Sequence, residues 1–280
     1  MGSGCSAISP SVEAPMNHHY PALWTATLQG QKEEVLQLLA KGATIDESGL
    51  HGSSPLHYAA SQGHEAVVQI LIEHGARVNC KDDDGWAPLH YAARSGQVSS
   101  AQLLLAHAAE VSVTDSHAAS PLHFAASRGH YDFSRLLLDH RADVSSKDTD
   151  GATPLSYAAR GGHEVVARLL LQHGADVSVT DNDGASELHY AACLGHEEVA
   201  QVLIEYGAEV TTKDRYGATP MCFATSEGHE AITRLLIEHG AEAPARVDAR
   251  MPLRSAASLA LARGVSQLLA RKGGGGQGQR

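Results

Sequence analysis

A block of seven residues returns along this chain at a fixed spacing of 33 residues. S-P-L-H-Y-A-A at 54–60 recurs as A-P-L-H-Y-A-A at 87–93, and then as S-P-L-H-F-A-A, T-P-L-S-Y-A-A and S-E-L-H-Y-A-A. A fixed period of this length indicates a stack of repeated units and rules out one ordinary globular core. Seven copies fit the pattern, and one shared column consists of Leu23, Leu56, Leu89, Leu122, Leu155, Leu188 and Met221.

The composition suits thin repeated layers and limits the classes of partner. Hydrophobic residues make up 43% of the chain and aromatic residues only 5%, so Leu, Val, Ile and Ala must form most of the core. The net charge is -11, from 21 Lys plus Arg and 32 Asp plus Glu. This charge repels phosphate backbones, so we expect no nucleic acid among the partners.

The cysteines and the apolar runs indicate a compartment. Cys5, Cys80, Cys193 and Cys222 form no C-x-x-C pair, and their irregular spacing indicates reduced thiols. No charged-then-apolar leader opens the chain, and no apolar run approaches the roughly 18 residues of a spanning helix. We therefore expect a cytoplasmic protein that is neither secreted nor membrane-spanning.

One unit, residues 49–81, predicts two helices and a turn. Ser54 is a good N-cap for a short first helix that Gly63 ends, and a second helix follows from about Glu65 to a left-handed stop at Gly75. The polar segment that leads to the next unit predicts an extended turn or hairpin. Such a unit cannot bury its apolar face alone, and stacking copies buries it.

The unit that begins D-x-D-G-x-T-P-L-x-x-A-A-x-x-G-H, matched most fully at 148–175, resembles the ankyrin repeat family. The resemblance implies an all-α solenoid of stacked helix-turn-helix units with β-hairpin fingers. In that family the fingers and the inner helices form a concave surface for protein partners. The resemblance implies no catalytic activity.

The pattern divides the chain into four segments. Residues 1–19 lack periodicity and are predicted to be disordered, and residues 20–242 hold repeats one to seven. Residues 243–270 keep a weaker copy with a slipped spacing, which predicts a degenerate capping repeat. Residues 271–280 form a Gly-rich flexible tail.

Most of the 18 histidines fall into three columns at the repeat period, which indicates a scaffold role. The resemblance implies that the first column hydrogen-bonds around the helix start. The H-E dipeptides never continue to the second His of a zinc-binding H-E-x-x-H, so we predict no metal site, no catalytic residue and no cofactor. The columns are His57, His90, His123 and His189; His64, His130, His163, His196 and His229; and His74, His107, His140, His173 and His239.

Departures from the repeat are more informative than matches. Trp86 follows a finger glycine, a place that the resemblance puts on the exposed concave side, where Trp is enriched among binding hot spots. The alternative is a Trp that lies flat on its own hairpin. Ala108 and Arg141 replace the helix-ending glycine and Ala118 replaces the finger glycine, so repeats three and four should be locally strained or reshaped.

The predicted partner surface combines these departures with charged residues on the same face. Its first patch is Trp86, Arg94, His117 and Arg128. Its weaker second patch is Arg215 and Tyr216, with Arg160, Cys193 and Leu194 between the two. Aspartates in the fingers help to form the turns and add up to an acidic edge that would steer basic segments of a partner. They are Asp82, Asp83, Asp84, Asp148, Asp150, Asp181 and Asp183.

The first six residues, M-G-S-G-C-S, fit a lipidation signal. Gly2 with Ser6 matches the myristoylation pattern, and Cys5 offers a palmitate site beside it. Two acyl chains hold a protein at a membrane where one scarcely does. The alternative is that M-G-S-G is a remnant of cloning.

These observations predict a non-enzymatic scaffold that binds a protein segment across repeats two to five. It would be cytoplasmic, and lipid-anchored at the cytosolic face of a membrane if the acylation signal is used. The alternative is a soluble structural or substrate-receptor subunit of a larger complex such as a ubiquitin ligase, although no ligase-docking box is recognisable after residue 242.

Overall fold

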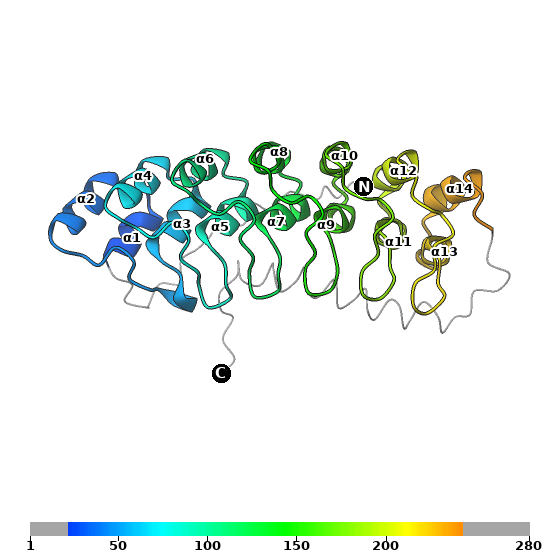
Figure 1. Ribbon diagram of the computed structural model, residues 1–280, viewed down its shortest axis with the longest axis horizontal. Coiled ribbons are helices and arrows are strands. Elements are labelled where there is room, and N and C mark those ends of the chain that lie inside the picture. Colours follow the sequence, from blue (N-terminus) through cyan, green and yellow to red (C-terminus); the bar gives the residue numbers. More distant parts are fainter. Residues whose placement is uncertain (1–21, 243–280) are drawn as a thin grey trace, which may run out of the picture.

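The computed structural model describes residues 22–242, which form seven helix pairs stacked side by side. Figure 1 shows the first helices of the pairs in an inner row, the second helices in an outer row, and the connecting fingers on one side of the inner row. The inner helices are α1 Ala22–Leu28, α3 Pro55–Gln62, α5 Pro88–Ser95, α7 Pro121–Ser127, α9 Pro154–Gly161, α11 Glu187–Leu194 and α13 Pro220–Glu227. The outer helices are α2 Lys32–Ala40, α4 Glu65–Glu73, α6 Val98–Ala106, α8 Tyr131–Asp139, α10 Glu164–Gln172, α12 Glu197–Glu205 and α14 Glu230–Glu238.

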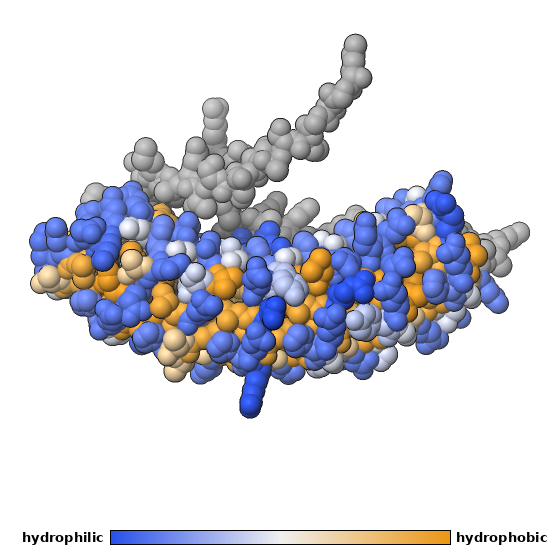
Figure 2. Space-filling view, turned by 90° about the horizontal axis from the view of Figure 1, so that it is seen from above, coloured by the Kyte–Doolittle hydropathy of each residue, from blue (hydrophilic) through white to orange (hydrophobic). Residues whose placement is uncertain are grey.

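The stack confirms the solenoid that the period predicts. Each helix pair packs on the pair before and the pair after it, and Leu, Val, Ile and Ala supply most of the continuous core between the layers. Seen from above the outer helices, the body is bowed, and hydrophobic residues run along it between hydrophilic side chains (Figure 2). A short 3-10 turn, η1 Leu50–Gly52, precedes α3.

Repeat two shows how the sequence sets the helix boundaries. Ser54 has an extended backbone and caps α3, and Gly63 ends the helix with a φ of 75°. The His57 ring lies at the start of α3, where its Nδ1 accepts a hydrogen bond of 3.0 Å from the Ser54 N–H. Its Nε2 therefore carries the proton and donates to the Trp86 carbonyl of the next repeat at 2.9 Å. The first histidine column thus fixes a helix start, as the resemblance implies, and the structure shows that it also joins adjacent repeats.

The other two histidine columns also bond to the backbone. In the second column, His64 Nε2 lies 3.0 Å from the Leu28 carbonyl of the preceding repeat. Its ring covers Gly30, where an added Cβ would come within 2.8 Å of the imidazole. In the third column, His74 Nδ1 lies 2.8 Å from the Ile70 carbonyl and caps the end of α4. Repeats one and two are therefore held in register by a glycine of one and a histidine of the next.

The fingers are tight turns held by an aspartate. Asp82 Oδ1 accepts hydrogen bonds from the Asp84 N–H and the Trp86 N–H, and the Asp82 N–H donates to the Trp86 carbonyl at 3.0 Å. Within residues 22–242 the fingers contain no β-strand, and pairing is limited to an isolated bridge between Thr180 and Ser186. The predicted hairpins are therefore Asp-capped turns.

One backbone hydrogen bond links each finger tip to the next. The Ser116 N–H donates to the Asp84 carbonyl at 3.0 Å, and the Thr149 N–H donates to the His117 carbonyl at 2.9 Å. The same bond recurs from Asn182 to Asp150 and from Arg215 to Asp183. One backbone hydrogen bond thus joins successive finger tips at each of these repeat junctions.

Repeats three and four keep the fold at the cost of backbone strain. Ala108, Ala118 and Arg141 adopt the positive φ of the glycines that they replace, with values of 63°, 60° and 64°. A non-glycine residue in this region costs about 1 kcal/mol. The structure therefore confirms strain at these positions and shows no reshaping of the turns.

Several predictions from the sequence concern residues outside this range. Gly2, Cys5, the predicted disordered segment, the degenerate capping repeat and the Gly-rich tail lie outside the described residues. Among residues 22–242, no helix combines the length and apolar character needed to cross a bilayer. No disulfide joins the cysteines of the same range.

Candidate functional site

Trp86 is buried, and the expectation that it is exposed is wrong. Its side chain is only 6% exposed because its ring packs on Phe124 of the next repeat, with the ring centroids 4.3 Å apart. Tyr91 meets the indole edge at 5.7 Å. The indole lies near Asp115 and opposes the rise that burial causes in the pKa of that carboxyl. The indole therefore lies at the junction of repeats three and four, and not flat on its own hairpin as the alternative has it.

The place of Trp86 follows from an aromatic substitution in the next repeat. In repeats three and five the hydroxyl of Tyr91 or Tyr157 donates to the finger aspartate of its own repeat at 2.8 Å. Phe124 fills the same position in repeat four and has no hydroxyl to offer Asp115. The Trp86 ring covers Phe124 and lies near Asp115, where it lowers the pKa of the carboxyl. Trp86 and Phe124 therefore compensate each other across the junction of repeats three and four.

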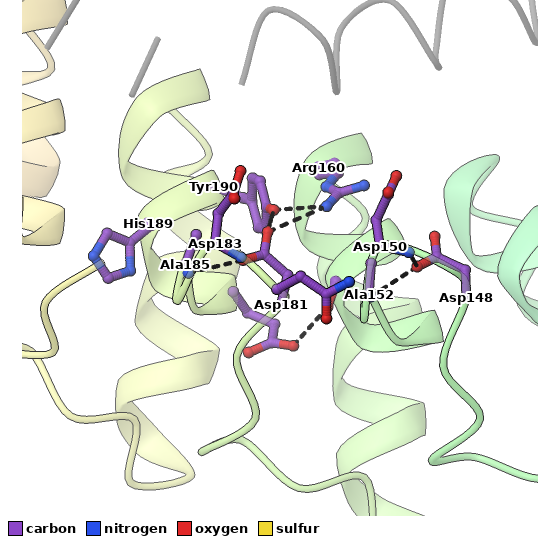
Figure 3. Close-up of polar contacts among 12 residues, drawn as sticks. Asp148, Asp150, Ala152, Arg160, Asp181, Asp183, Ala185, His189 and Tyr190 are labelled. Carbon is purple, nitrogen blue, oxygen red and sulfur yellow. Dashed lines mark hydrogen bonds and ion pairs between the residues drawn. The ribbon is translucent and has the colours of Figure 1, made fainter. Parts of the chain in front are cut away.

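Arg160 lies in a polar cluster between repeats five and six. Its Nη2 donates to the Tyr190 hydroxyl at 2.6 Å and lies 3.9 Å from the Asp181 carboxylate, and its guanidinium stacks on the Tyr190 ring at 4.1 Å. Tyr190 in turn donates a hydrogen bond to the Asp181 carboxylate. The Ala185 N–H donates to the same carboxylate at 2.9 Å (Figure 3). The Arg160 side chain is 13% exposed, so the cluster uses most of its surface to join the two repeats.

Arg94 and Arg128 lie next to each other at the junction of repeats three and four. Arg94 is in the last turn of α5, half-buried, with its guanidinium 5.8 Å from the centroid of Trp86. Arg128 follows α7 and is exposed. Burial first, and the charge of Arg128 second, lower the pKa of Arg94. The structure therefore brings three of the four residues of the first predicted patch together.

The other predicted residues are spread along the stack. His117 is exposed at a finger tip, with its Nδ1 3.2 Å from Ser116 Oγ. Leu194 is half-buried at the end of α11. Arg215 forms an ion pair with Asp183 of the preceding finger, and its guanidinium lies 5.6 Å from the centroid of Tyr216. The second patch is therefore partly neutralised by the finger beside it.

The acidic edge is smaller than the sequence predicts. Asp82 and Asp148 are each 9% exposed, because their carboxylates hold the finger turns. Asp115 and Asp214 do the same in repeats four and seven and were missed, although their spacing of 33 residues was the available signal. The Asp181 side chain, also 9% exposed, holds the finger of repeat six in the same way. The aspartates that remain exposed or half-exposed are Asp83, Asp84, Asp150 and Asp183.

A buried carboxyl group at repeats five and six was also missed. Glu187 replaces the proline that begins the first helix in repeats two to five, and it is 1% exposed. Its Oε1 accepts from Ser156 Oγ at 2.7 Å and from Thr153 Oγ1 at 3.3 Å. Its Oε2 has no hydrogen-bond partner among the described residues. Burial raises the pKa of Glu187 to about 7.

Glu187 compensates a missing histidine. Ser156 stands in the first histidine column, and it is too short to reach the carbonyl of Ala185 as His123 reaches that of Ala152, at 3.3 Å. Glu187 instead reaches back from the next repeat to the Ser156 hydroxyl. The only sequence signal was a pair of departures in adjacent repeats: Ser156 stands in place of a histidine, and Glu187 stands in place of a proline.

The histidine columns give the described residues no metal site. Among residues 22–242, no group of three His, Cys, Asp or Glu side chains is placed to hold a metal ion. The first-column rings are buried, and burial lowers the pKa of His90 to about 3 and that of His123 to about 4. These two imidazoles are therefore neutral at pH 7 and hydrogen-bond to backbone carbonyls of the next repeat.

Comparison with known proteins agrees with this geometry. The family model for ankyrin repeats (three copies) matches residues 23–115, 77–148, 122–214 and 173–247. The chain belongs to the ankyrin repeat family. The crystal structure of the human ASB11 ankyrin repeat domain is similar at 28% sequence identity and a TM-score of 0.72, covering 81% of this chain and 100% of that one. The search of curated proteins finds no match.

Proposed function

We propose that this chain is a non-enzymatic scaffold that binds a segment of a protein partner on the surface formed by the inner helices and the fingers of repeats two to five. Ankyrin repeats generally mediate protein-protein interaction, and the family membership is shown. The observation that favours this surface is Arg128. It is exposed on an inner helix end, and within residues 22–242 it forms no ion pair.

The proposal narrows the set of binding residues. Trp86 and Arg160 are mostly buried and join neighbouring repeats, so their contribution to binding would be indirect. Arg94, His117 and Arg128 remain the first candidates for direct contact, followed by Leu194 and Tyr216. Exposed aspartates of the finger tips would attract basic residues that flank the bound segment.

Affinity capture followed by mass spectrometry tests the proposal. The bait is the whole chain, compared with the double variant His117→Ala, Arg128→Ala and with the control Arg135→Ala. Arg135 is an exposed arginine of the same repeat on the outer helix α8. We expect proteins that are captured by the wild type and the control and lost by the double variant. Equal capture by all three baits would overturn the proposed surface.

Membrane attachment is a separate part of the proposal. We propose that acyl chains on Gly2 and Cys5 hold the scaffold at the cytosolic face of a membrane, on the basis of the M-G-S-G-C-S pattern alone. Cell fractionation of the wild type and of Gly2→Ala with Cys5→Ser tests this part. The variant should leave the membrane fraction, and equal distributions would remove the lipid anchor.

The alternative role as a subunit of a larger complex remains a second proposal. The similarity to the ankyrin repeat domain of human ASB11 is compatible with it. The capture experiment separates the two roles. A stable complex whose members all remain bound to the double variant would favour a subunit that docks through another surface.

A further inference from the structure

Repeat seven leaves one side of its helices uncovered. α13 and α14 stand at the end of the stack (Figure 1), and we call the side that faces away from repeat six the end face. Ile237 of α14 is 51% exposed, whereas the equivalent residues of the six earlier repeats are buried or half-buried, down to 7% at Leu171. In the described part of the chain the end face is therefore an apolar layer without a following repeat.

Three further positions belong to the end face. Thr225 and Thr233 are half-exposed, although the residues in the same columns of repeats two to six are fully buried. An added Cβ on Gly228 would meet no described atom within 4 Å. The equivalent Gly195, by contrast, is covered by the ring of His229. All these positions face the place that an eighth repeat would occupy.

The chain itself continues from the end face and keeps the columns of a second helix. Val265 and Leu269 come 33 residues after Ile232 and Leu236. Ile232 and Leu236 are 1% and 0% exposed although no described repeat follows them, so residues in their columns pack toward the repeat before. Val265 and Leu269 are thus apolar at the two positions that would pack on repeat seven.

The charges of this segment and of repeat seven are opposite. Repeat seven exposes carboxylates at Glu227, Glu230, Glu238 and Glu242. The chain after Glu242 has a single acidic residue, Asp248, in a protein whose net charge is -11. Opposite charges favour the return of the segment to this end of the stack. The basic residues of the segment are Arg246, Arg250, Arg254, Arg263, Arg271, Lys272 and Arg280.

The segment lacks contacts that hold the earlier repeats together. Ala262 comes 33 residues after His229, so it has no ring with which to cover Gly228. Residues 243–263 contain no glycine, so neither a finger turn nor the end of a first helix has its usual glycine. Packing of the segment on repeat seven would depend on the apolar columns and on charge, and it should be weaker than packing between earlier repeats.

The two threonines suit a surface that is covered at some times and open to water at others. Thr225 Oγ1 donates to the Met221 carbonyl at 2.8 Å, and Thr233 Oγ1 donates to the His229 carbonyl at 3.0 Å. A hydroxyl that is hydrogen-bonded within its own helix can be buried without the cost of an unsatisfied donor. The same hydroxyl is hydrated when the surface is uncovered.

We propose that residues 243–272 of this chain dock reversibly on the end face, with Val265 and Leu269 packed on α14 and the basic residues beside the exposed glutamates of repeat seven. The occupant is a segment in cis, because its direct connection to Glu242 gives it a high effective concentration. The end face is separate from the proposed partner surface on repeats two to five, so either proposal can fail alone.

Hydrogen exchange of the whole chain, measured by mass spectrometry, tests the docking. Leu269→Asp places a charge in the apolar column and should speed amide exchange in α13 and α14 about tenfold, while α3 to α9 stay unchanged. Ala270→Asp is the matched control, because position 270 continues the column of Ile237, which faces the next repeat and would here face solvent. It should leave the exchange within about twofold.

A reciprocal variant and a salt series sharpen the result. Ile237→Asp changes the end face itself at an exposed position, so it should speed the exchange of residues 243–272 without unfolding the stack. Combining it with Leu269→Asp should add little, because either change alone releases the segment. About 1 M NaCl should bring the exchange of α14 in the wild type toward that of Leu269→Asp, since salt screens exposed charges.

The opposite outcomes are equally clear. Equal exchange of α13 and α14 in the wild type, Leu269→Asp and Ala270→Asp would overturn the docking. Protection that rises with protein concentration would also overturn it, because a second copy of the chain would then cover the end face. Protection of α14 that is unchanged in about 1 M NaCl would overturn the role assigned to charge.

Discussion

Arg94 and Arg160 occupy equivalent positions in repeats three and five, yet their surroundings differ. Arg160 donates to the Tyr190 hydroxyl, lies near the Asp181 carboxylate and stacks on two tyrosine rings. The Arg94 guanidinium lies over the Trp86 ring, near a second arginine, Arg128. Arg160 joins two repeats through a tyrosine and an aspartate, and Arg94 packs on a tryptophan with a second arginine nearby.

The difference originates in the following repeat. Phe124 stands where Tyr190 stands two repeats later, so it offers Arg94 no hydroxyl. Asp115, which corresponds to Asp181, lies near the Trp86 indole. The role of a residue in this stack is therefore set by the unit after its own, and functional positions have to be judged on pairs of repeats.

The largest expected effect is that of Trp86→Ala on stability. Removal of a buried indole leaves a cavity beside Phe124, so we expect a loss of about 3 to 5 kcal/mol in the free energy of unfolding. Urea denaturation followed by circular dichroism measures it, and Arg135→Ala should change little. An unchanged melting temperature together with lost partner capture would show that Trp86 contributes to partner binding and not to stability.

Glu187→Gln should remove a pH dependence from the junction of repeats five and six. The pKa of Glu187 is raised from 4.5 to about 7 in the folded chain. Its stabilising contribution is therefore present in full below pH 4.5 and is lost as the pH rises through 7. The loss amounts to about 3 kcal/mol relative to the glutamine variant.

The measurement for Glu187 is a difference between two proteins. The buried first-column histidines act in the opposite sense: burial lowers their pKa, so their contribution is present above the unfolded value of 6.5 and falls as the pH falls. Urea unfolding of wild type and variant from pH 5 to pH 8 cancels this shared term. A difference in unfolding free energy that stays constant over that range would contradict a proton on Glu187.

Phe124→Tyr in the Trp86→Ala background should make the junction of repeats three and four resemble the junction of repeats five and six. The new hydroxyl can donate to Asp115 as Tyr157 donates to Asp148. Because a hydrogen bond to a charged group contributes about 1.5 to 3 kcal/mol, the double variant should recover part of the stability that Trp86→Ala loses. A double-mutant cycle in urea measures the coupling, and simple additivity would show that the indole acts through packing alone.

The smallest effects concern the strained turns of repeats three and four. Ala108→Gly and Arg141→Gly keep the positive φ without a Cβ clash, so each should raise stability by about 1 kcal/mol. Ala106→Gly, at the exposed end of α6, is the matched control and should lower stability by a similar amount. A stabilising effect at position 106 as well would mean that the gain does not depend on the sign of φ.

The period predicted most of the architecture and little of the site. It gave the helix pairs, their order, the capping residues and the scaffold role of the histidines, because these depend on interactions that every repeat shares. The burial of Trp86 and the pairing of Ser156 with Glu187 could not be foreseen residue by residue. Each departure is compensated by a second departure in the next repeat, so neither is interpretable in its own unit.

The contact between a glycine and the histidine of the following repeat limits how such a chain can change in length. The imidazole of His64 fills the space over Gly30, and His130, His163, His196 and His229 fill the same space over Gly96, Gly129, Gly162 and Gly195. Gln97 covers Gly63 in the same way, so each of repeats one to six presents a glycine that a side chain of the next repeat covers. Whole repeats can be duplicated, deleted or exchanged between chains while the contact between glycine and histidine is preserved. An insertion of part of a repeat between the two residues moves the histidine away from its glycine.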